Sequence, residues 1–215
     1  MKYSKMELPS RADHLWRYTP WKRIHPTSVE QVPEAIPIRW SLNEGGSLSD
    51  GVPEHSMSDD IAQIFLSELT SEKVSLSVDG SASIVHLDGV ASGHAAAGRL
   101  HIDFPQDTTV VIHLSGEADW AGLHITGSVQ ANVRAGVGFV NELSANTKFL
   151  RCEDWIVERD ARLELAALSV GGFRCKNDLR TRLNATGSSL KQAISVHGHN
   201  QRHVDHHIEI HHNVG

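Results

Sequence analysis

From residue 73 onward, the chain alternates apolar and polar residues in short runs, which is the pattern of half-buried β-strands. VSLSV at 74–78, LHIDF at 100–104 and HVDHHIEIHH at 203–212 are clear examples. The other predicted strands are 83–87, 109–114, 123–125, 128–133, 154–157, 162–168, 178–183 and 190–196. Gly, Ala, Asn or Asp separates these runs at intervals of roughly 8–12 residues. Residues 71–215 are therefore predicted to form an all-β domain.

Three β architectures fit this pattern: a sandwich, a closed barrel and a coil of parallel strands, the β-helix. Within the strand-rich region from residue 73, Asp-Gly, which favours tight hairpins, occurs at Asp79-Gly80 and Asp88-Gly89 and then not again. Aromatic residues make up only 6% of the chain, which suits stacked rungs better than a bulky sandwich core. The two Asp-Gly pairs also predict an antiparallel hairpin among the first strands. The pattern favours the coil but leaves the other two architectures open.

Residues 1–70 lack the alternation and are predicted to form an extension of short helices and linker. Residues 10–18 (SRADHLWRY) predict a short helix that ends before Pro20. Leu15, Trp16 and Tyr18 are expected to be buried, whereas Arg11 and Arg17 are expected to remain in contact with water. Residues 26–56 are rich in Pro, Ser, Gly and acidic groups. They predict a connector with at most one short strand, near 36–42.

A second helix is predicted over about residues 59–69. Ser58 is a candidate N-cap, and Asp59 and Asp60 fall in the first turn, where the helix dipole favours negative charge. Four apolar residues follow at helical spacing and are expected to pack on the β-domain: Ile61, Ile64, Phe65 and Leu69.

Charge and hydropathy exclude several classes of protein. A formal net charge of −6 at pH 7 argues against binding to the phosphate backbone of nucleic acids. No apolar run approaches the roughly 20 residues of a membrane helix, and the N-terminus has no signal-peptide core. We therefore expect a soluble, cytoplasmic protein that binds neither nucleic acid nor membrane. The only cysteines, Cys152 and Cys175, are expected to be reduced and buried.

Histidines concentrate in residues 197–215, HGHNQRHVDHHIEIHHNVG, which hold seven of the fifteen in the chain. Side chains alternate across a strand. One face of the strand at 203–212 therefore carries Val204, His206, Ile208, Ile210 and His212, and its apolar residues predict that it faces inward. The outward face carries His203, Asp205, His207, Glu209 and His211.

The outward face has two interpretations. We favour a solvated ladder or a surface for a partner subunit, in which imidazoles and carboxylates of neighbouring rungs bond to each other. The alternative is a metal site formed by His203, Asp205, His207, Glu209 and His211. Same-face neighbours lie about 6.6–7 Å apart, so two imidazoles can reach one ion, and mixtures of histidine and carboxylate suit zinc or iron.

Both ends of the chain resemble the SufB/SufD family of iron–sulfur cluster assembly proteins, and SufD more closely. The first match is Leu15-Trp16-Arg17-Tyr18-Thr19-Pro20. The second spans residues 171–212 in three pieces. Gly-Gly and a basic residue precede Asn177-Asp178-Leu179. A Gly-x-x-x-x-Leu segment then runs from Gly187 to Asn200, and His203-Val204-Asp205-His206-His207 completes the match.

The resemblance implies a right-handed parallel β-helix and membership of a complex with a SufB-like subunit and a SufC-like ATPase. Such complexes build iron–sulfur clusters and pass them on. The SufD-like member is implied to be a scaffold or accessory subunit with no catalytic residues and no firm cofactor. A cluster would be held only transiently in the full complex.

The family continues beyond the point that corresponds to Gly215. We therefore expect a C-terminally truncated relative, with an N-terminal extension over 1–70 and an incomplete β-helix over 71–215. Its open end would favour homo-oligomers, because unpaired strand edges associate. Two alternatives remain: a stand-alone His-rich metal-binding protein and, less favoured, a β-helix enzyme that acts on carbohydrate. A hexapeptide acyltransferase is disfavoured because the chain lacks a strict six-residue aliphatic repeat.

Overall fold

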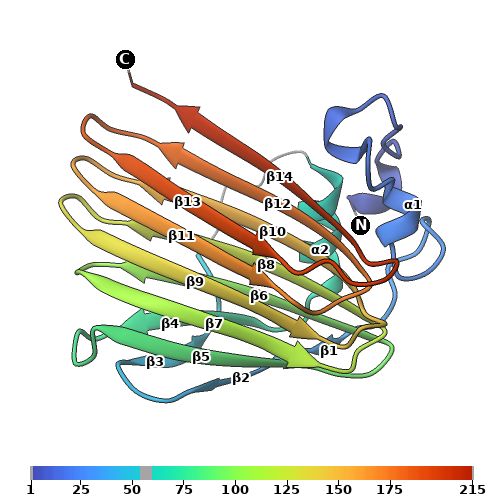
Figure 1. Ribbon diagram of the computed structural model, residues 1–215, viewed down its shortest axis with the longest axis horizontal. Helices are drawn as coiled ribbons and strands as arrows, with labels where there is room; N and C mark the ends of the chain where they lie inside the picture. Colours follow the sequence, from blue (N-terminus) through green and yellow to red (C-terminus); the bar gives the residue numbers. More distant parts are fainter. Residues whose placement is uncertain (1, 54–59, 215) are drawn as a thin grey trace.

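Two sheets face each other across a narrow core in the computed structural model, which describes residues 2–53 and 60–214 (Figure 1). Sheet A has the order β14-β12-β10-β8-β6-β4-β3, with β1 paired to β6, and sheet B has the order β13-β11-β9-β7-β5-β2. The strands of sheet A are β1 (Ile36–Pro37), β3 (Gly46–Asp50), β4 (Lys73–Val78), β6 (Ala95–Phe104), β8 (Trp120–Val129), β10 (Lys148–Val157), β12 (Arg174–Leu183) and β14 (His203–His212). Those of sheet B are β2 (Arg39–Leu42), β5 (Ile84–Ala91), β7 (Thr108–Gly116), β9 (Arg134–Leu143), β11 (Arg162–Ser169) and β13 (Ser189–Val196).

From β4 onward the chain passes alternately through the two sheets, so each circuit adds one strand to each sheet. Every pair from β4–β6 to β12–β14 is parallel and in register. The result is a parallel β-solenoid of about five turns. The predicted parallel β-helix is confirmed, and the sandwich and the barrel are excluded.

The core lies between the sheets, where alternate residues of every strand point inward. Val85, Leu87, Val110, Ile112 and Leu163 from sheet B are fully buried against the inward residues of sheet A. Each residue contacts its equivalents in the coils above and below, so the core forms continuous apolar columns. Burial of these columns is the main stabilising contribution to the solenoid.

The helices gather on one side of the coil, over the outer face of sheet A (Figure 1). They are the 3₁₀-helices η1 (Tyr3–Lys5) and η2 (His14–Trp16) and the α-helices α1 (Trp21–Ile24) and α2 (Ile61–Leu69). In α2, the buried residues Ile61, Ile64, Phe65 and Leu69 pack as predicted. Their cluster includes Trp16, Trp21 and Trp120. The N-terminal extension is therefore docked to the solenoid by its own apolar core.

Two predictions for the extension are corrected. Residues 10–18 form only the short η2, and Tyr18 is 65% exposed although burial was expected. Ser58 and Asp59 lie outside the described residues. Asp60 is the N-cap of α2 and does not lie in its first turn, because its carboxylate accepts hydrogen bonds from the backbone N–H groups of Ala62 (2.8 Å) and Gln63 (3.4 Å).

The first strands also differ from the prediction. Residues 36–50 form three strands where at most one was expected, because β2 and β3 add antiparallel to β5 and β4 at the start of the coil. Asp79-Gly80 does not form a hairpin, since β4 and β5 belong to different sheets. There the Asp79 carboxylate accepts from Ser81 N (2.8 Å) and Gly80 has a φ of +76°, so the dipeptide turns the chain from one sheet to the other.

Candidate functional site

One register row on the outer face of sheet A gathers chemically active side chains from neighbouring strands. Parallel pairing aligns the residues in the order Arg99, His124, Cys152, Asp178 and His207. Neighbouring strands lie about 4.8 Å apart, so adjacent members of this row are within contact range. The three central residues are at most 2% exposed, because α2 and the rest of the extension pack over them.

A buried carboxylate next to this row ties α2 to the solenoid. Asp154 is 3% exposed and accepts hydrogen bonds from Gln63 Nε2 (2.7 Å) and His124 Nε2 (3.0 Å). A hydrogen bond to a buried carboxylate contributes about 1.5–3 kcal/mol. Gln63 therefore fixes the position of α2 through a polar contact inside an otherwise apolar interface.

Asp178 is the centre of a second buried group. Arg180 donates to it at 2.6 Å, and His207 Nδ1 lies 2.9 Å away. Burial raises the pKa of Asp178, but the bonds from His207 and Arg180 outweigh burial, and the net pKa is lowered. Burial and the charge of Asp178 raise the pKa of Asp60, whose carboxylate lies 3.5 Å from Arg180. The second group therefore joins the start of α2 to β12 and β14.

Cys152 lies among these carboxylates and is fully buried. Burial, followed by the charges of Asp178, Asp60 and Asp154, raises the pKa of its thiol well above the usual value. The thiol is therefore protonated at neutral pH and is a poor nucleophile or metal ligand in this conformation. Cys175 faces the interior of the solenoid, so the two cysteines point to opposite sides of sheet A. The predicted pair of free, buried cysteines is confirmed.

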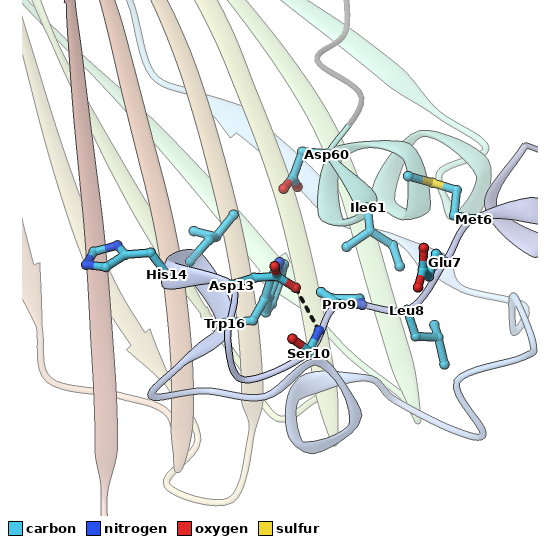
Figure 2. A pocket seen from close by; sticks show the side chains of 11 residues that line it. Met6, Glu7, Leu8, Pro9, Ser10, Asp13, His14, Trp16, Asp60 and Ile61 are labelled. Atoms are coloured by element: carbon cyan, nitrogen blue, oxygen red, sulfur yellow. Dashed lines mark hydrogen bonds between the residues drawn. The ribbon is translucent and has the colours of Figure 1, made fainter.

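A pocket of about 570 Å³ opens beside the buried groups, between the N-terminal segment and the start of α2 (Figure 2). Two of its lining residues connect it to the row. Asp60 contacts Arg180, and the ring of His14 meets the ring of His207 edge-on at 5.9 Å between centroids. Glu7 and Asp13 also line the pocket, and none of the described residues that line it is a lysine or arginine. The pocket is thus acidic, and a ligand in it would lie next to the second buried group, which Asp60 and His14 contact.

A comparison with known protein families gives a match over most of the repeated coil. A family model described as SUF system FeS cluster assembly, SufBD core domain, matches residues 89–215, which is more than half of the chain. The chain belongs to this family. The predicted resemblance to SufB/SufD proteins is thereby confirmed, and it assigns the chain to iron–sulfur cluster assembly. No curated protein and no solved structure matches the chain.

The SufBD core domain holds the row from His124 to His207, whereas Gln63 and Asp60 come from the extension that precedes the matched residues. The buried groups therefore join the family's domain to a segment outside the match. Among the described residues, no helix is long and apolar enough to cross a membrane.

The structure places the predicted metal ligands on one face of β14 and brings only Glu209 and His211 into contact with each other, whereas His203, Asp205 and His207 contact residues outside the strand. The contacts are His203 Nε2 to Thr19 Oγ1 (2.9 Å), Asp205 to Lys176 (3.1 Å), His207 to Asp178 (2.9 Å), Glu209 to Arg180 (3.6 Å) and His211 to Glu209 (2.8 Å). In residues 2–53 and 60–214, no three histidine, cysteine or acidic side chains converge on a common point that could hold a metal. Metal binding by this face stays a prediction. The favoured ladder of imidazole and carboxylate across rungs is confirmed for His207 and Asp178.

The opposite face of β14 points toward the interior, as predicted, but is only partly covered. Val204 packs against the core, whereas Ile208 and Ile210 are 45% and 44% exposed. His206 points the same way, and neither ring nitrogen has a hydrogen-bond partner among the described residues. Burial, followed by the charge of Arg151, lowers the pKa of His206 to about 4. His206 is therefore neutral at physiological pH.

Sequence reasoning missed most of the buried groups. His124, Asp154 and Arg180 lie in segments predicted as strands, but nothing in one strand marks its polar residues as buried. Gln63 lies among the apolar residues of α2, and its polar partner is 91 residues away. The available signal was the separation of partners across coils, which is 25 residues for His101 and Thr126 and 29 for Asp178 and His207. This separation can be recognised in the sequence only when the number of residues in one coil is known.

Proposed function

We propose that this chain is a SufD-like scaffold or accessory subunit of a SufBCD-type complex, and that it works through contacts with a SufB-like subunit and a SufC-like ATPase. The observation that carries the proposal is the match of the SufBD core domain over residues 89–215. The chain is proposed to have no enzymatic activity of its own. An iron–sulfur cluster is the cargo of the assembly and is shared only within the complex.

The form of the molecule supports a scaffold role. A solenoid with continuous apolar columns is rigid along its axis, and it presents long, flat sheet faces on which partners can dock. The row's thiol is protonated and covered, His207 and Asp178 of the row pair with each other, and His124 pairs with Asp154 beside the row. These features favour a role in positioning partner proteins over a role in catalysis.

Co-purification tests the proposal. The complete gene product, carrying an affinity tag, would be co-expressed with the SufC-like ATPase and the SufB-like subunit of the same organism. We expect both to be retained in stoichiometric amounts after a wash at moderate salt, and the ATPase alone to be retained less well. Retention of neither partner by a folded protein would contradict the proposal.

A second measurement separates a scaffold from an enzyme. The purified complex would be loaded with iron and sulfide, and transfer of a cluster to an apoprotein would be followed by absorbance and circular dichroism. Omission of this subunit should abolish transfer, whereas the subunit alone should neither build nor transfer a cluster. Cluster assembly by the isolated subunit would contradict the proposed role.

A further inference from the structure

A second pocket, of about 590 Å³, lies on the other side of the N-terminal segment at residues 8–10. Both pockets are lined by Leu8, Pro9 and Ser10, so this segment forms a wall between them. Arg11, Lys22 and Arg23 line the second pocket, and none of the described residues that line it is acidic. The two neighbouring pockets therefore have opposite charge.

The three cations of the second pocket are not neutralised within the described chain. None of them forms an ion pair of 4.0 Å or less in residues 2–53 and 60–214. Glu7 and Asp13, which are close in sequence, line the acidic pocket instead. Asp13 is held there because its carboxylate accepts a hydrogen bond from Ser10 N at 2.7 Å, as Figure 2 shows.

Positive charge extends from the pocket onto the adjoining strand starts. The pKa of Arg174, at the start of β12, is lowered by burial and by the charge of Arg23. The pKa of His203, at the start of β14, is lowered by burial and then by Arg174, with Arg23 contributing. Cations thus repel one another at this corner of a molecule whose formal net charge is −6. An anionic partner would relieve the repulsion.

Apart from Ser10, the other residues that line the pocket are apolar. Leu8, Pro9, Pro20, Trp21 and Val29 line it beside the cations. Trp21 is 2% exposed, donates its indole N–H to the hydroxyl of Tyr3 at 3.0 Å and meets Trp16 edge-on. A preformed apolar floor with exposed cations at its rim suits a ligand that carries both apolar and acidic side chains.

We infer that this basic pocket docks an acidic segment of a partner protein, with an apolar side chain on the floor and carboxylates against Arg11, Lys22 and Arg23. Guanidinium groups bind carboxylates through paired hydrogen bonds, and a pocket of this size accommodates a few residues of extended peptide. The inference does not depend on the role in cluster assembly, and its failure would leave the proposed function as it stands.

Fluorescence anisotropy with labelled peptides tests the inference. The probe is a peptide of alternating Glu and Leu, compared with the same peptide in which Gln replaces Glu. We expect saturable binding of the acidic peptide that weakens steadily as salt is raised, and at least tenfold weaker binding of the Gln peptide. Equal binding of the two peptides, or no saturable binding of either, would overturn the inference.

Charge-reversal variants locate the site. Lys22→Glu with Arg23→Glu should weaken binding of the acidic peptide at least tenfold, and the matched control is Arg162→Glu with Lys191→Glu. Both control residues are exposed on sheet B, and Lys191 lies 3.9 Å from Glu164. Lys22→Gln with Arg23→Gln should give an intermediate loss with unchanged thermal unfolding, which separates binding from folding.

Two results would overturn the assignment to this pocket. The first is an equal loss in the pocket variant and the control, since binding would then depend on overall charge. The second is full displacement of the peptide by inorganic pyrophosphate at concentrations near that of the protein, since the pocket would then be a site for small anions.

Discussion

At the residue scale, the solenoid holds an ion pair inside its core, packed against aromatic rings, in which Arg151 Nε has no hydrogen-bond partner among the described residues. Arg151 is 2% exposed, lies 3.3 Å from Glu153 and stacks over Phe139 at 4.0 Å from the ring centroid. Glu153 also accepts a hydrogen bond from the indole of Trp155 at 2.8 Å. His206 lies within the field of the same arginine but has no such partner. Arg151 therefore has an opposite charge within reach, whereas neither ring nitrogen of His206 has a hydrogen-bond partner among the described residues.

His206 is expected to make the protein sensitive to acid. Above the unfolded pKa of 6.5 the imidazole is neutral in both states, so it has no effect. Between pH 6.5 and the folded pKa of about 4, only the unfolded chain takes up the proton, so the free energy of unfolding decreases as the pH falls. Urea unfolding should show that the stability of His206→Leu relative to the wild type is about 1–2 kcal/mol higher at pH 5 than at pH 7.

The control for His206 is His86→Leu, at an exposed position on sheet B. It should change the stability equally at both pH values. Parallel pH profiles for the wild type and His206→Leu would show that His206 is not buried as a neutral group.

The outward face of β14 is expected to bind metal only weakly. An ion held by His207 and His211 would have to replace the contacts of His207 with Asp178 and of His211 with Glu209. Calorimetry should therefore detect no heat from zinc or ferrous iron at micromolar concentration. Micromolar affinity that is lost in His207→Ala with His211→Ala, but kept in the exposed control His94→Ala, would instead establish the metal site.

At the element scale, the strands that the sequence predicts well are those with one polar face and one apolar face. β4, β7, β11, β13 and β14 begin and end close to the predicted positions. β8 is a single strand where two were expected, because Gly127 interrupts the alternation while Trp155 packs into the space that its missing side chain leaves. Alternation is informative only where one face of a strand remains polar.

Several strands escaped the prediction wholly or in part, and β6 and β12 were predicted only over residues 100–104 and 178–183. β9 was not predicted, because its outward glycines, Gly136 and Gly138, carry no side chain and lower the apparent strand propensity. Only the end of β10 was predicted, because Arg151 and Glu153 point inward while the outward Leu150 and Cys152 are covered by the extension. A covered outer face removes the polar half of the alternation, and its cover lies far away in sequence.

The docking of α2 provides a test at this scale. Gln63→Glu would place a second carboxylate against Asp154, which is already buried beside His124. We expect a loss of about 2–4 kcal/mol at neutral pH, because a buried carboxylate loses its donor and gains a like charge. Limited proteolysis should then cut within α2 while the strands stay protected.

The matched control for α2 is Ser67→Glu, which adds the same charge to the same helix at a partly exposed position. It should cost less than 1 kcal/mol. Equal proteolysis of the wild type and Gln63→Glu would show that the contact with Asp154 does not hold the helix.

At the scale of the whole molecule, the coil distributes its stability along columns rather than in one central core. Phe149 and Phe139 stack across the two sheets, with centroids 6.1 Å apart and planes within 8°. The columns on either side of this contact continue through every coil. The fold class was predictable from alternation and resemblance, whereas the buried polar groups depend on distances across coils that no local pattern reports.

A pair of truncations tests this distribution. Phe149→Ala removes a fully buried ring, so we expect it to cost about 3–5 kcal/mol, whereas Leu168→Ala, at a residue 41% exposed on sheet B, should cost less than 1 kcal/mol. Chemical unfolding followed by circular dichroism measures both. Similar costs at the two positions would contradict the placement of the core between the sheets.

The in-register stacking of the row from Arg99 to His207 keeps equivalent residues of successive coils aligned, one strand spacing apart. Deleting one residue inside β10 would exchange its two faces, so that Arg151 would leave the core and Cys152 would enter it. Extra residues at the bends between sheets would lengthen one circuit without moving any rung. Relatives of this chain should therefore differ in the length of their bends while keeping the order of residues along each rung, and they are best aligned one circuit at a time.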